Sequence, residues 1–190
     1  MMLALLLSVS APLTSRAEDA PNPLCAACHM PDGNSTNPKF PKLAGLNTTY
    51  IIKQIMDFKN TKRVEEIMSS MAGRITEQEA VVMAEFYSKQ KRTPGTVTNP
   101  ALAAQGQLIY DQGIDSSAVP ACTGCHETDG SGSRKIPNLA GQHTYYLIMQ
   151  LKNFRNGLRN NDGRMRAVAK RMTDQEIAAV AEYITGLKGE

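Results

Sequence analysis

The sequence predicts an all-α protein that contains two copies of one helical unit. Segments of the second half repeat segments of the first half at a nearly constant distance along the chain. Within these segments apolar residues recur at the spacing of one helix face, and no segment shows the alternation that indicates a half-buried strand. The composition, with 42% hydrophobic residues, 21 basic and 18 acidic side chains in 190 residues, is that of an ordinary globular protein.

The repeat consists of three pairs of matching blocks, 96 or 97 residues apart. The pairs are Cys25–Gly33 with Cys122–Gly130, Pro41–Lys59 with Pro137–Arg155, and Ile75–Tyr87 with Met172–Ile184. Two prolines and a glycine in "KRTPGTVTNP" indicate a linker between the copies. We therefore expect a signal peptide over 1–17, a first domain over 18–91, a linker over 92–100 and a second domain over 101–190.

The first 17 residues have the pattern of a secretion signal. An apolar stretch covers Met2–Val9, and the small residues Ser15 and Ala17 occupy the two positions that a signal peptidase reads. The stretch is shorter than the roughly 20 residues that cross a bilayer. It is atypical of a secretion signal in one respect, because no basic residue precedes it. The alternative, a buried N-terminal helix, is disfavoured by Pro12 and the polar residues after it. We expect export to the periplasm, and an uncleaved signal would instead anchor the chain.

Each copy is expected to contain two clearly marked helices. The first covers "TYIIKQIMDFKN" in one copy and "YYLIMQLKNFRN" in the other, with apolar residues on one face. The last helix opens with a capping box, formed by Thr76 with Glu79 and by Thr173 with Glu176. A unit of this size is small for a self-sufficient core, so a large apolar cofactor in each copy would complete its interior.

Each copy also contains a Cys-x-x-Cys-His motif. The residues are Cys25, Cys28 and His29 in the first copy and Cys122, Cys125 and His126 in the second. This is the attachment signal of c-type haem. Two thiols one helical turn apart form thioethers with one porphyrin, and the adjacent histidine faces the iron as its proximal ligand. The two motifs therefore predict two covalently bound haem c groups, held by the four cysteines, with both histidines as iron ligands.

Two other interpretations of the cysteines are weaker. A single zinc site built from all four cysteines would leave both histidines without a role. The two motifs would also have to share one metal, whereas each already looks complete. A thioredoxin-like dithiol needs a βαβ setting, which an all-α chain does not offer. Disulfides are common in exported proteins, but they give no reason for the histidine to recur.

The sixth position of the haem iron decides the chemistry. Methionine there raises the potential and suits electron transfer, whereas an open position invites reaction with oxygen or peroxide. The chain has ten methionines, and most methionines in proteins are core residues. Met68 and Met165 each lie eight residues before the threonine that caps the last helix, in what we expect to be a loop. We predict these two as distal ligands, with Met71, which aligns with Val168, as the alternative in the first half.

Other repeated residues are expected around the haem pockets. Pro41 and Pro137 are expected to form the wall beside each proximal histidine. Tyr50 and Tyr146 either hydrogen-bond a haem propionate or simply pack, and basic side chains near each ring would neutralise the propionates. His143, the remaining histidine, is expected to be a surface residue, with a role as an iron ligand as the alternative.

Taken together, the motifs resemble those of the dihaem cytochrome c4 family. The resemblance rests on "CAACHMPDGNS", "FPKLAG", "CTGCHETDG", "PNLAGQH" and the spacing from methionine to "TEQE" or "TDQE", and it covers essentially all of the mature chain. It implies two class I cytochrome c domains related by a pseudo-twofold axis, with haems that face each other. It also implies ligation by His29 with Met68 and by His126 with Met165, and a periplasmic electron carrier that serves a terminal oxidase.

The first half departs from this family pattern at its start. Such domains begin with a helix that crosses the last helix through a glycine and an aromatic residue, as Gly106 and Tyr110 are expected to do in the second half. In the first half only "EDAPNPL" precedes the first cysteine, and Pro21 and Pro23 are expected to prevent a helix. Phe86 would then lack its aromatic partner. The first domain would be less stable, unless the interface between the domains covers the gap.

The net charge of +3 is modest, but its distribution is uneven. The segment Arg155–Arg171 carries six basic residues and one acidic residue around Met165. We expect this face to dock on an acidic partner, with Arg159 and Arg164 as the residues to exchange in a test. The alternative is a solvated face that also balances propionates. Neither the charge nor the expected compartment supports binding to nucleic acid.

Three functions are compatible with these observations. The leading one is a non-enzymatic electron carrier between redox proteins, such as a quinol-oxidising complex or a dehydrogenase and a terminal oxidase. The second is the cytochrome subunit of a flavoprotein or another periplasmic dehydrogenase. The third is a dihaem peroxidase, which the matching methionines disfavour. Association with a membrane is expected only through partners or an uncleaved signal.

Overall fold

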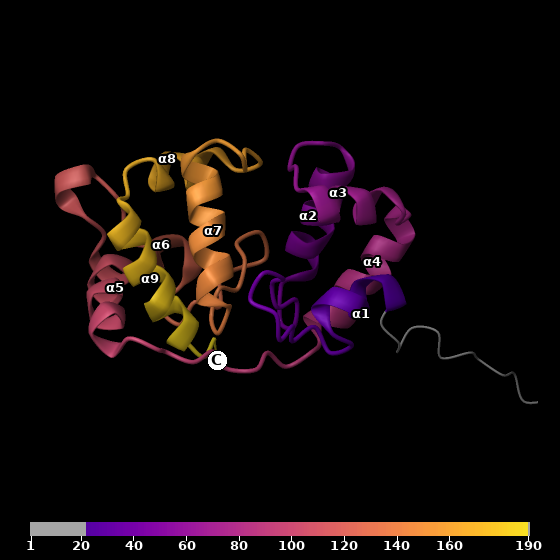
Figure 1. The fold of residues 1–190 in the computed structure, drawn as a ribbon, viewed down its shortest axis with the longest axis horizontal. Helices are drawn as coiled ribbons and strands as arrows, with labels where there is room; N and C mark the ends of the chain where they lie inside the picture. The colour runs from indigo at the N-terminus through magenta and orange to yellow at the C-terminus, as the bar shows by residue number, and fades with distance from the viewer. Residues whose placement is uncertain (1–21, 190) are drawn as a thin grey trace, which may run out of the picture.

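The computed structural model describes residues 22–189, so the signal peptide expected over 1–17 lies outside this range. Over the described residues the chain forms helices joined by loops, and β-structure is limited to isolated bridges. The α-helices are α1 (Pro23–His29), α2 (Thr48–Lys59), α3 (Glu66–Gly73), α4 (Glu77–Ser88), α5 (Pro100–Gln112), α6 (Thr123–His126), α7 (Thr144–Arg155), α8 (Gly163–Ala169) and α9 (Asp174–Gly186). The all-α prediction is confirmed, and Figure 1 shows two groups of helices side by side. None of the described helices has the length and apolar character needed to cross a membrane.

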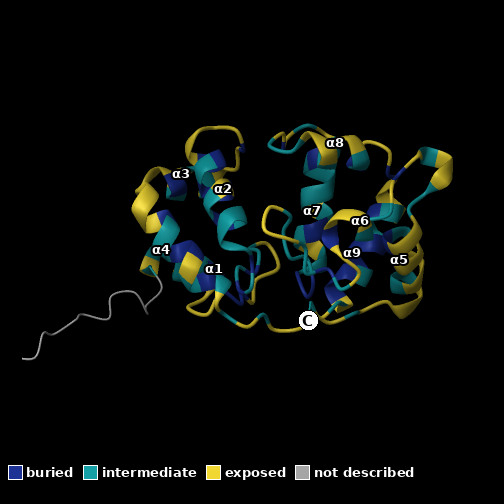
Figure 2. Cartoon of the chain, turned by 180° about the vertical axis from the view of Figure 1, so that it is seen from behind, coloured by how far each residue is buried: buried dark blue, intermediate teal, exposed yellow. Residues whose placement is uncertain are grey.

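Each group of helices encloses its own hydrophobic core. The first core includes Ile51, Ile55, Phe58, Met83 and Tyr87. The second core includes Tyr110, Leu147, Ile177, Val180 and Ile184. Figure 2 shows buried residues within both groups and exposed residues on their outer surfaces. The chain therefore divides its buried apolar surface between two halves, in keeping with the repeat in its sequence.

The last helix of each half begins at the capping box that the sequence predicts. In α4 the hydroxyl of Thr76 accepts from the backbone N–H of Glu79 at 3.2 Å. The carboxylate of Glu79 in turn accepts from the backbone N–H of Thr76 at 2.8 Å. Thr173 and Glu176 form the same reciprocal pair at the start of α9. Each box satisfies two N–H groups that would otherwise lack a partner at the end of a helix.

The second half contains the predicted crossing of its first and last helices. A Cβ atom at Gly106 of α5 would lie 2.0 Å from the carbonyl oxygen of Ala179 in α9. Only glycine therefore permits this approach of the two backbones. The rings of Tyr110 and Tyr183 pack beside the crossing with their centroids 5.4 Å apart.

The first half begins with the motif helix α1. Its first residue is Pro23, and the side chain of Asn22 caps it by accepting from the N–H of Leu24 at 2.9 Å. Pro23 starts this motif helix, because a proline at the first helical position loses no hydrogen bond and has a suitable φ. It does not belong to a crossing helix, which is the helix that the two prolines were expected to prevent. Pro21 lies outside the described residues. Within residues 22–189, no helix before α1 corresponds to α5.

Among residues 22–189, Phe86 of α4 therefore has no counterpart of the Tyr110 ring that packs against Tyr183 in α9. The ring that packs against it belongs to its own neighbour, Tyr87, with centroids 5.2 Å apart. The start of α1 covers part of α4, since the N–H of Asn22 lies 3.1 Å from the sulfur of Met83. Phe86 itself stays half-buried.

The segment between α4 and α5 runs along one edge of both halves (Figure 1). It is tied to α9 by Glu182, which is 3% exposed. The Glu182 carboxylate accepts from the backbone N–H and the hydroxyl of Thr98 and, at 2.7 Å, from the N–H of Asn99. One buried carboxylate thus holds the end of the connecting segment at the start of α5.

The two halves meet along an interface that we call the seam. On the side of the connecting segment, Arg92 donates to the carbonyl of Ala44 at 2.7 Å in the first half and to that of Asn138 at 3.0 Å in the second. The side chain of Gln142 exchanges two hydrogen bonds, both 2.9 Å, with the backbone of Lys42. Backbone groups of the two halves are therefore bridged by side chains at this side of the seam.

Candidate functional site

Both Cys-x-x-Cys-His motifs lie on short helices that end at the histidine. His29 ends α1 and is 5% exposed, and His126 ends α6 and is 7% exposed. Nδ1 of His29 lies 2.9 Å from the carbonyl oxygen of Pro41, and Nδ1 of His126 lies 3.3 Å from that of Pro137. Because a carbonyl only accepts, each ring carries its proton on Nδ1 and keeps the lone pair of Nε2 for a ligand role. Both prolines lie beside the histidines, as the sequence predicts.

The electrostatics of the two histidines support the same role. Burial lowers the pKa of His29, and it also lowers the pKa of His126, against the opposing effect of each proline carbonyl. A lowered pKa keeps the imidazole neutral near pH 7. A neutral imidazole is the form that binds a metal.

The four thiols do not have the properties of a redox dithiol. Cys25, Cys28 and Cys122 are half-buried free thiols, and Cys125 is an exposed one. Burial raises the pKa of Cys25 and raises that of Cys122 to about 11, whereas redox-active dithiols have a lowered thiol pKa. Over residues 22–189 no group of three or more His, Cys, Asp or Glu side chains is placed to hold a metal ion. The cysteines therefore do not converge on a shared zinc site.

The chain leaves each motif through a residue with left-handed backbone. These residues are Met30, with φ 67°, and Glu127, with φ 64°. Neither is glycine, so nothing in the residue types predicts this turn. In the second half the hydroxyl of Tyr110 donates to the carbonyl of Glu127 at 2.7 Å, which ties α5 to the end of the motif. The sequence predicts the ring packing of Tyr110 but not this hydrogen bond.

Met68 and Met165 lie on short helices, α3 and α8, and the expectation of a loop at these positions is wrong. Each helix has its own cap. The carboxylate of Glu65 accepts from the N–H of Met68 at 2.8 Å, and that of Asp162 accepts from the N–H of Met165 at 3.1 Å. Both methionines are half-buried, and Met68 packs against the first core.

Met71, the alternative ligand in the first half, lies three residues after Met68 in the same helix. Its counterpart in the second half, Val168, packs against the second core. The position of Met71 thus corresponds to a packing position in the repeat. The choice between Met68 and Met71 stays a prediction, for which a test is given below.

Polar side chains fill the seam on the side away from the connecting segment. They form three pairs of corresponding residues, which we call the seam cluster: Tyr50 and Tyr146, Gln54 and Gln150, and Arg63 and Arg159. Arg63 is 8% exposed and Arg159 is 7% exposed. Each guanidinium lies over a phenylalanine of its own half, 4.5 Å from the ring of Phe58 and 4.4 Å from that of Phe154.

Each arginine of the seam cluster binds the tyrosine of the other half. Arg63 donates to the hydroxyl of Tyr146 at 3.1 Å, and Arg159 donates to that of Tyr50 at 2.9 Å. Both tyrosine hydroxyls therefore accept a hydrogen bond from a guanidinium, a contact that the sequence does not predict. A hydrogen bond from either hydroxyl to a propionate stays a prediction. Among the described residues no carboxylate lies within ion-pair distance of either guanidinium. Two buried positive charges thus face each other with neutral partners only, which is costly unless an anion is close.

His143 belongs to the seam, and the expectation of a surface position is wrong. It is half-buried because the first half covers it: Nε2 lies 2.8 Å from the carbonyl oxygen and 3.0 Å from the hydroxyl of Ser35. Burial, with the charges of Lys42 and Arg92, lowers the pKa of His143. The contact with Ser35 occupies a nitrogen that an iron ligand would use. Asn47, its counterpart, also bonds across the seam, to the carbonyl of Ile136 at 3.1 Å.

The basic face predicted for Arg155–Arg171 is smaller than its sequence indicates. Arg159 is buried in the seam cluster and is therefore a wrong choice for a test of surface docking. Arg164 has 72% of its side chain exposed, and Lys170 and Arg171 are exposed as well. These three residues form the basic surface of the second half.

Comparison with known proteins relates both the sequence and the fold to one group. The family model for cytochrome c matches residues 103–188. Cytochrome c4 of Thiocapsa roseopersicina is 46% identical over 171 residues, which cover 87% of this chain and 88% of that protein. The crystal structure of reduced recombinant cytochrome c4 from Pseudomonas stutzeri is similar with a TM-score of 0.83 at 39% identity, covering 87% of this chain and 94% of that one.

A further relative has a more specific description. The thiosulfate dehydrogenase electron acceptor of Thiomonas intermedia is 35% identical over 167 residues, which cover 84% of this chain and 76% of that protein. Similarity thus extends from cytochromes c4 to a protein that accepts electrons from an enzyme.

Proposed function

Because the chain belongs to the cytochrome c4 family of electron carriers, we propose that it carries single electrons between redox proteins of the periplasm through two haem c groups, one in each half. Membership of the cytochrome c family implies covalently bound haem c, and the motif is present twice. When bound, the haem iron supplies reversible one-electron exchange. The protein supplies ligands, exclusion of water and a fixed arrangement of the two sites. The proposed domains are 18–91 and 101–190, joined by 92–100.

The covalent attachment is assigned to the two cysteine pairs, and the proximal ligands to the histidines that follow them. The residues are Cys25, Cys28 and His29 in the first half and Cys122, Cys125 and His126 in the second. One observation carries this assignment: in both halves a buried imidazole is fixed through Nδ1 by a proline carbonyl, which leaves Nε2 for iron. The free, half-buried or exposed thiols one and four residues before each histidine fit thioether formation.

The distal ligands in this proposal are Met68 and Met165. Equivalent residues on equivalent helices support the pair, because both halves then provide the same sulfur ligand. A thioether ligand in both halves favours electron transfer and leaves no open position for peroxide. It therefore also disfavours a dihaem peroxidase.

The seam cluster fits the propionates of two such haems. Its two buried guanidiniums have neutral partners only, so they gain most from an anionic group. Each lies beside a tyrosine hydroxyl, which is a second donor for a carboxylate. In this role Arg63, Arg159, Tyr50 and Tyr146 would hold propionates and exclude water from the seam.

The proposed location and partners follow from the same function. An N-terminal secretion signal and covalent haem both suit a periplasmic carrier, and a terminal oxidase is the proposed acceptor. A second candidate, the electron-accepting subunit of a dehydrogenase, is favoured by the similarity to the electron acceptor of Thiomonas intermedia. Isolation of the native protein separates the two: a dehydrogenase subunit keeps its catalytic partner through purification, whereas a free carrier is obtained alone.

The basic surface formed by Arg164, Lys170 and Arg171 is the proposed docking site for an acidic partner. Exchange of Arg164 and Lys170 for glutamate should slow electron transfer to such a partner and flatten its dependence on salt. Lys89, an exposed residue at the end of α4, is the matched control and should tolerate the same exchange. An unchanged salt dependence in the double variant would refute docking through this surface.

The proposal as a whole is tested by the haem content and ligation of protein matured in a bacterial periplasm. Mass spectrometry of the denatured chain should show two covalently bound haems, and one or none would contradict the proposal. Met68→Ala should remove the sulfur-to-iron charge-transfer absorption of one haem, and Met165→Ala that of the other. Met71→Ala should leave both signals intact, whereas a loss in this variant would assign the distal ligand of the first half to Met71.

A further inference from the structure

Each half contains one fully buried tyrosine, but the two tyrosines come from different helices. Tyr110 of α5 is 0% exposed, and Tyr87 of α4 is 1% exposed. They do not correspond in the repeat, because Tyr87 aligns with Ile184 of α9. Among residues 22–189, no helix of the first half corresponds to α5. The tyrosine of the first half therefore enters its core from the last helix of that half.

Both tyrosine rings pack against the same position of the last helix. Tyr110 lies against Tyr183 with the ring centroids 5.4 Å apart. Tyr87 lies against Phe86, its own neighbour in α4, with the centroids 5.2 Å apart. Phe86 and Tyr183 are counterparts in the repeat. Each half thus has one pair of packed aromatic rings at this position, although a different helix supplies the tyrosine.

The two tyrosine hydroxyls lie near corresponding residues of the two motifs. Burial raises the pKa of both tyrosines, and nearby acidic groups raise it further. In each half these groups include a cysteine and an aspartate at the same repeat positions: Cys25 and Asp32 beside Tyr87, and Cys122 and Asp129 beside Tyr110. From different helices, the tyrosines therefore reach the same part of the repeated unit.

The hydroxyl of Tyr110 has a defined role in the second half. It donates to the carbonyl of Glu127 at 2.7 Å, at the left-handed residue that follows His126. The N–H of Gly130 donates to the same carbonyl at 3.3 Å and closes the turn. Because His126 directly precedes this turn, the hydroxyl fixes the backbone that carries the proximal ligand.

The turn after His29 has the same form, and the ring of Tyr87 packs on it. Met30 has left-handed backbone, and its carbonyl accepts from the N–H of Gly33 at 3.0 Å. A Cβ atom at Gly33 would lie 2.7 Å from Cδ1 of Tyr87, so the ring contacts this turn. The Tyr87 hydroxyl is buried and has no hydrogen-bond partner among residues 22–189. A buried hydroxyl without a partner is costly, whereas the carbonyl of Met30 can accept a second hydrogen bond.

We propose that Tyr87 is a positioning residue of the first haem site and does from α4 what Tyr110 does from α5. In the haem-bound protein its hydroxyl donates to the Met30 carbonyl and fixes the turn after His29. This inference rests on the proposed function. A fixed turn holds Nδ1 of His29 on the Pro41 carbonyl, and so keeps Nε2 directed at the iron.

Tyr87→Phe tests the hydroxyl alone, because it keeps the ring. The measurement is deuterium exchange of the Nδ1 protons of His29 and His126, followed by NMR of the oxidised holoprotein, in which the iron shifts these signals away from the others. Exchange at His29 should become about three- to tenfold faster, because its turn loses one hydrogen bond. Exchange at His126 should stay the same. Unchanged exchange at His29 would overturn the inference.

Two further variants separate the hydroxyl from the ring. Tyr110→Phe is the reciprocal variant and should speed exchange at His126 and not at His29. Tyr87→Ile copies Ile184 and removes both the ring and the hydroxyl. It should speed exchange at His29 as Tyr87→Phe does, and it should also lower the midpoint of urea unfolding. Faster exchange in Tyr87→Ile but not in Tyr87→Phe would show that Tyr87 only packs.

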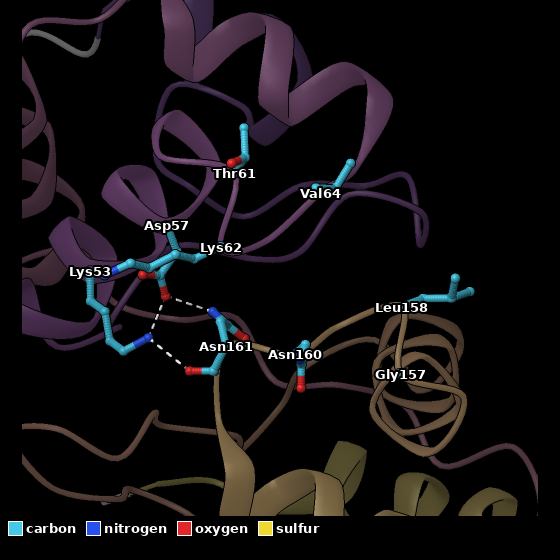
Figure 3. A pocket seen from close by; sticks show the side chains of 9 residues that line it. All are labelled: Lys53, Asp57, Thr61, Lys62, Val64, Gly157, Leu158, Asn160 and Asn161. Atoms are coloured by element: carbon cyan, nitrogen blue, oxygen red, sulfur yellow. Dashed lines mark hydrogen bonds and ion pairs between the residues drawn. The ribbon is translucent and has the colours of Figure 1, made fainter.

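Lys53→Met is the control for a general loss of stability. Figure 3 shows Lys53 joined by dashed lines to Asp57 and Asn161, at a cavity of about 610 Å³ that both halves line. The variant copies Met149 and removes contacts that belong to neither motif. It should leave exchange at both histidines unchanged.

Faster exchange at His29 in Lys53→Met would show that this exchange follows overall stability, and it would overturn the role of Tyr87. Failure of the proposed function has a different result. A wild-type protein without two covalently bound haems has no pair of iron-shifted histidine signals, and it would refute the proposed function itself.

Discussion

At the scale of single residues, the turn after α2 and α7 places two different residue types in left-handed backbone. Thr61 has φ 56°, and its counterpart Gly157 has φ 76°. A β-branched residue is strained in this region, whereas glycine is not. The first half therefore carries a local strain that the second half avoids.

Replacement of Thr61 by glycine should stabilise the protein by about 0.5–1 kcal/mol, since the relieved strain exceeds the added chain entropy of glycine. Urea unfolding of the holoprotein measures the change. Gly157→Thr is the reciprocal control and should destabilise the protein, because threonine is strained at this positive φ. A Cβ there meets only the end of the Arg166 side chain at 3.9 Å, so the loss would come from the backbone and not from a clash. A loss of stability in Thr61→Gly would show that the threonine side chain contributes more than its strain costs.

Roles that depend on residues close together in the sequence were predictable. Roles that depend on contacts between the two halves, across the seam, were not. The prolines beside His29 and His126 follow from repeated motifs. His143 and Arg159 look like surface residues in the sequence because their partners, Ser35 and Tyr50, lie about 110 residues away in the chain. Their repeat positions were the available signal, since Asn47 and Arg63 also bond across the seam.

At the scale of helices, the crossing of α5 and α9 depends on one glycine. Gly106→Ala should destabilise the second half by about 2–4 kcal/mol, because a Cβ 2.0 Å from the Ala179 carbonyl forces the helices apart. Gly163→Ala in α8 is the control: nothing lies within 4 Å of a Cβ there, so alanine should be neutral or stabilising. Thermal unfolding of both variants decides the matter, and equal stabilities would contradict the close approach.

Glu182 makes the attachment of the connecting segment depend on pH. Burial raises its pKa, but hydrogen bonds from Asn99, Thr98 and Thr144 outweigh burial, so the pKa lies below its ordinary value. A depressed folded-state pKa gives stability that is present above the unfolded value of about 4.3 and is lost as pH falls through the folded value. Glu182→Gln should therefore cost about 1–3 kcal/mol at pH 7.

The difference between wild type and Glu182→Gln should shrink as unfolding is measured at pH values falling below about 4.3. Glu85 occupies the same repeat position in α4 and is exposed, so Glu85→Gln is the matched control and should change little at any pH. A difference that stays constant down to acid pH would contradict the role of the Glu182 carboxylate.

Long amphipathic helices and their caps were predictable from the sequence, but short helices were not. The period of α2 and α7 and the capping boxes of α4 and α9 are local signals. Helices α3 and α8 are only 8 and 7 residues long, so their apolar residues extend over about two turns, which is too short for a clear helical signal in the sequence. Their caps, Glu65 and Asp162, were the missed signal.

At the scale of the whole molecule, the two halves differ in what supports their last helix. Helix α9 packs against both α5 and α7, whereas α4 packs against α2. We therefore predict that amides of α4 exchange with deuterium faster than those of α9, since less surface is buried around α4. Hydrogen-exchange mass spectrometry of the holoprotein tests this. Equal protection of the two helices would show that other contacts compensate the first half for its different start.

The division into two repeated halves was evident from the sequence, whereas the seam was not. Periodicity identifies the units, but the pairing of Arg63 with Tyr146 and of Arg159 with Tyr50 is decided by how the units dock. That docking brings together the residues that we propose hold the haem propionates.

The most direct test of two electron-carrying sites in one chain is an anaerobic potentiometric titration, followed optically, of protein matured in a periplasm. We predict two c-type centres per chain, each taking one electron and both titrating at positive potential. One high and one low centre would contradict matched histidine–methionine ligation and favour a peroxidase. Absence of any reversible haem centre would contradict the account as a whole.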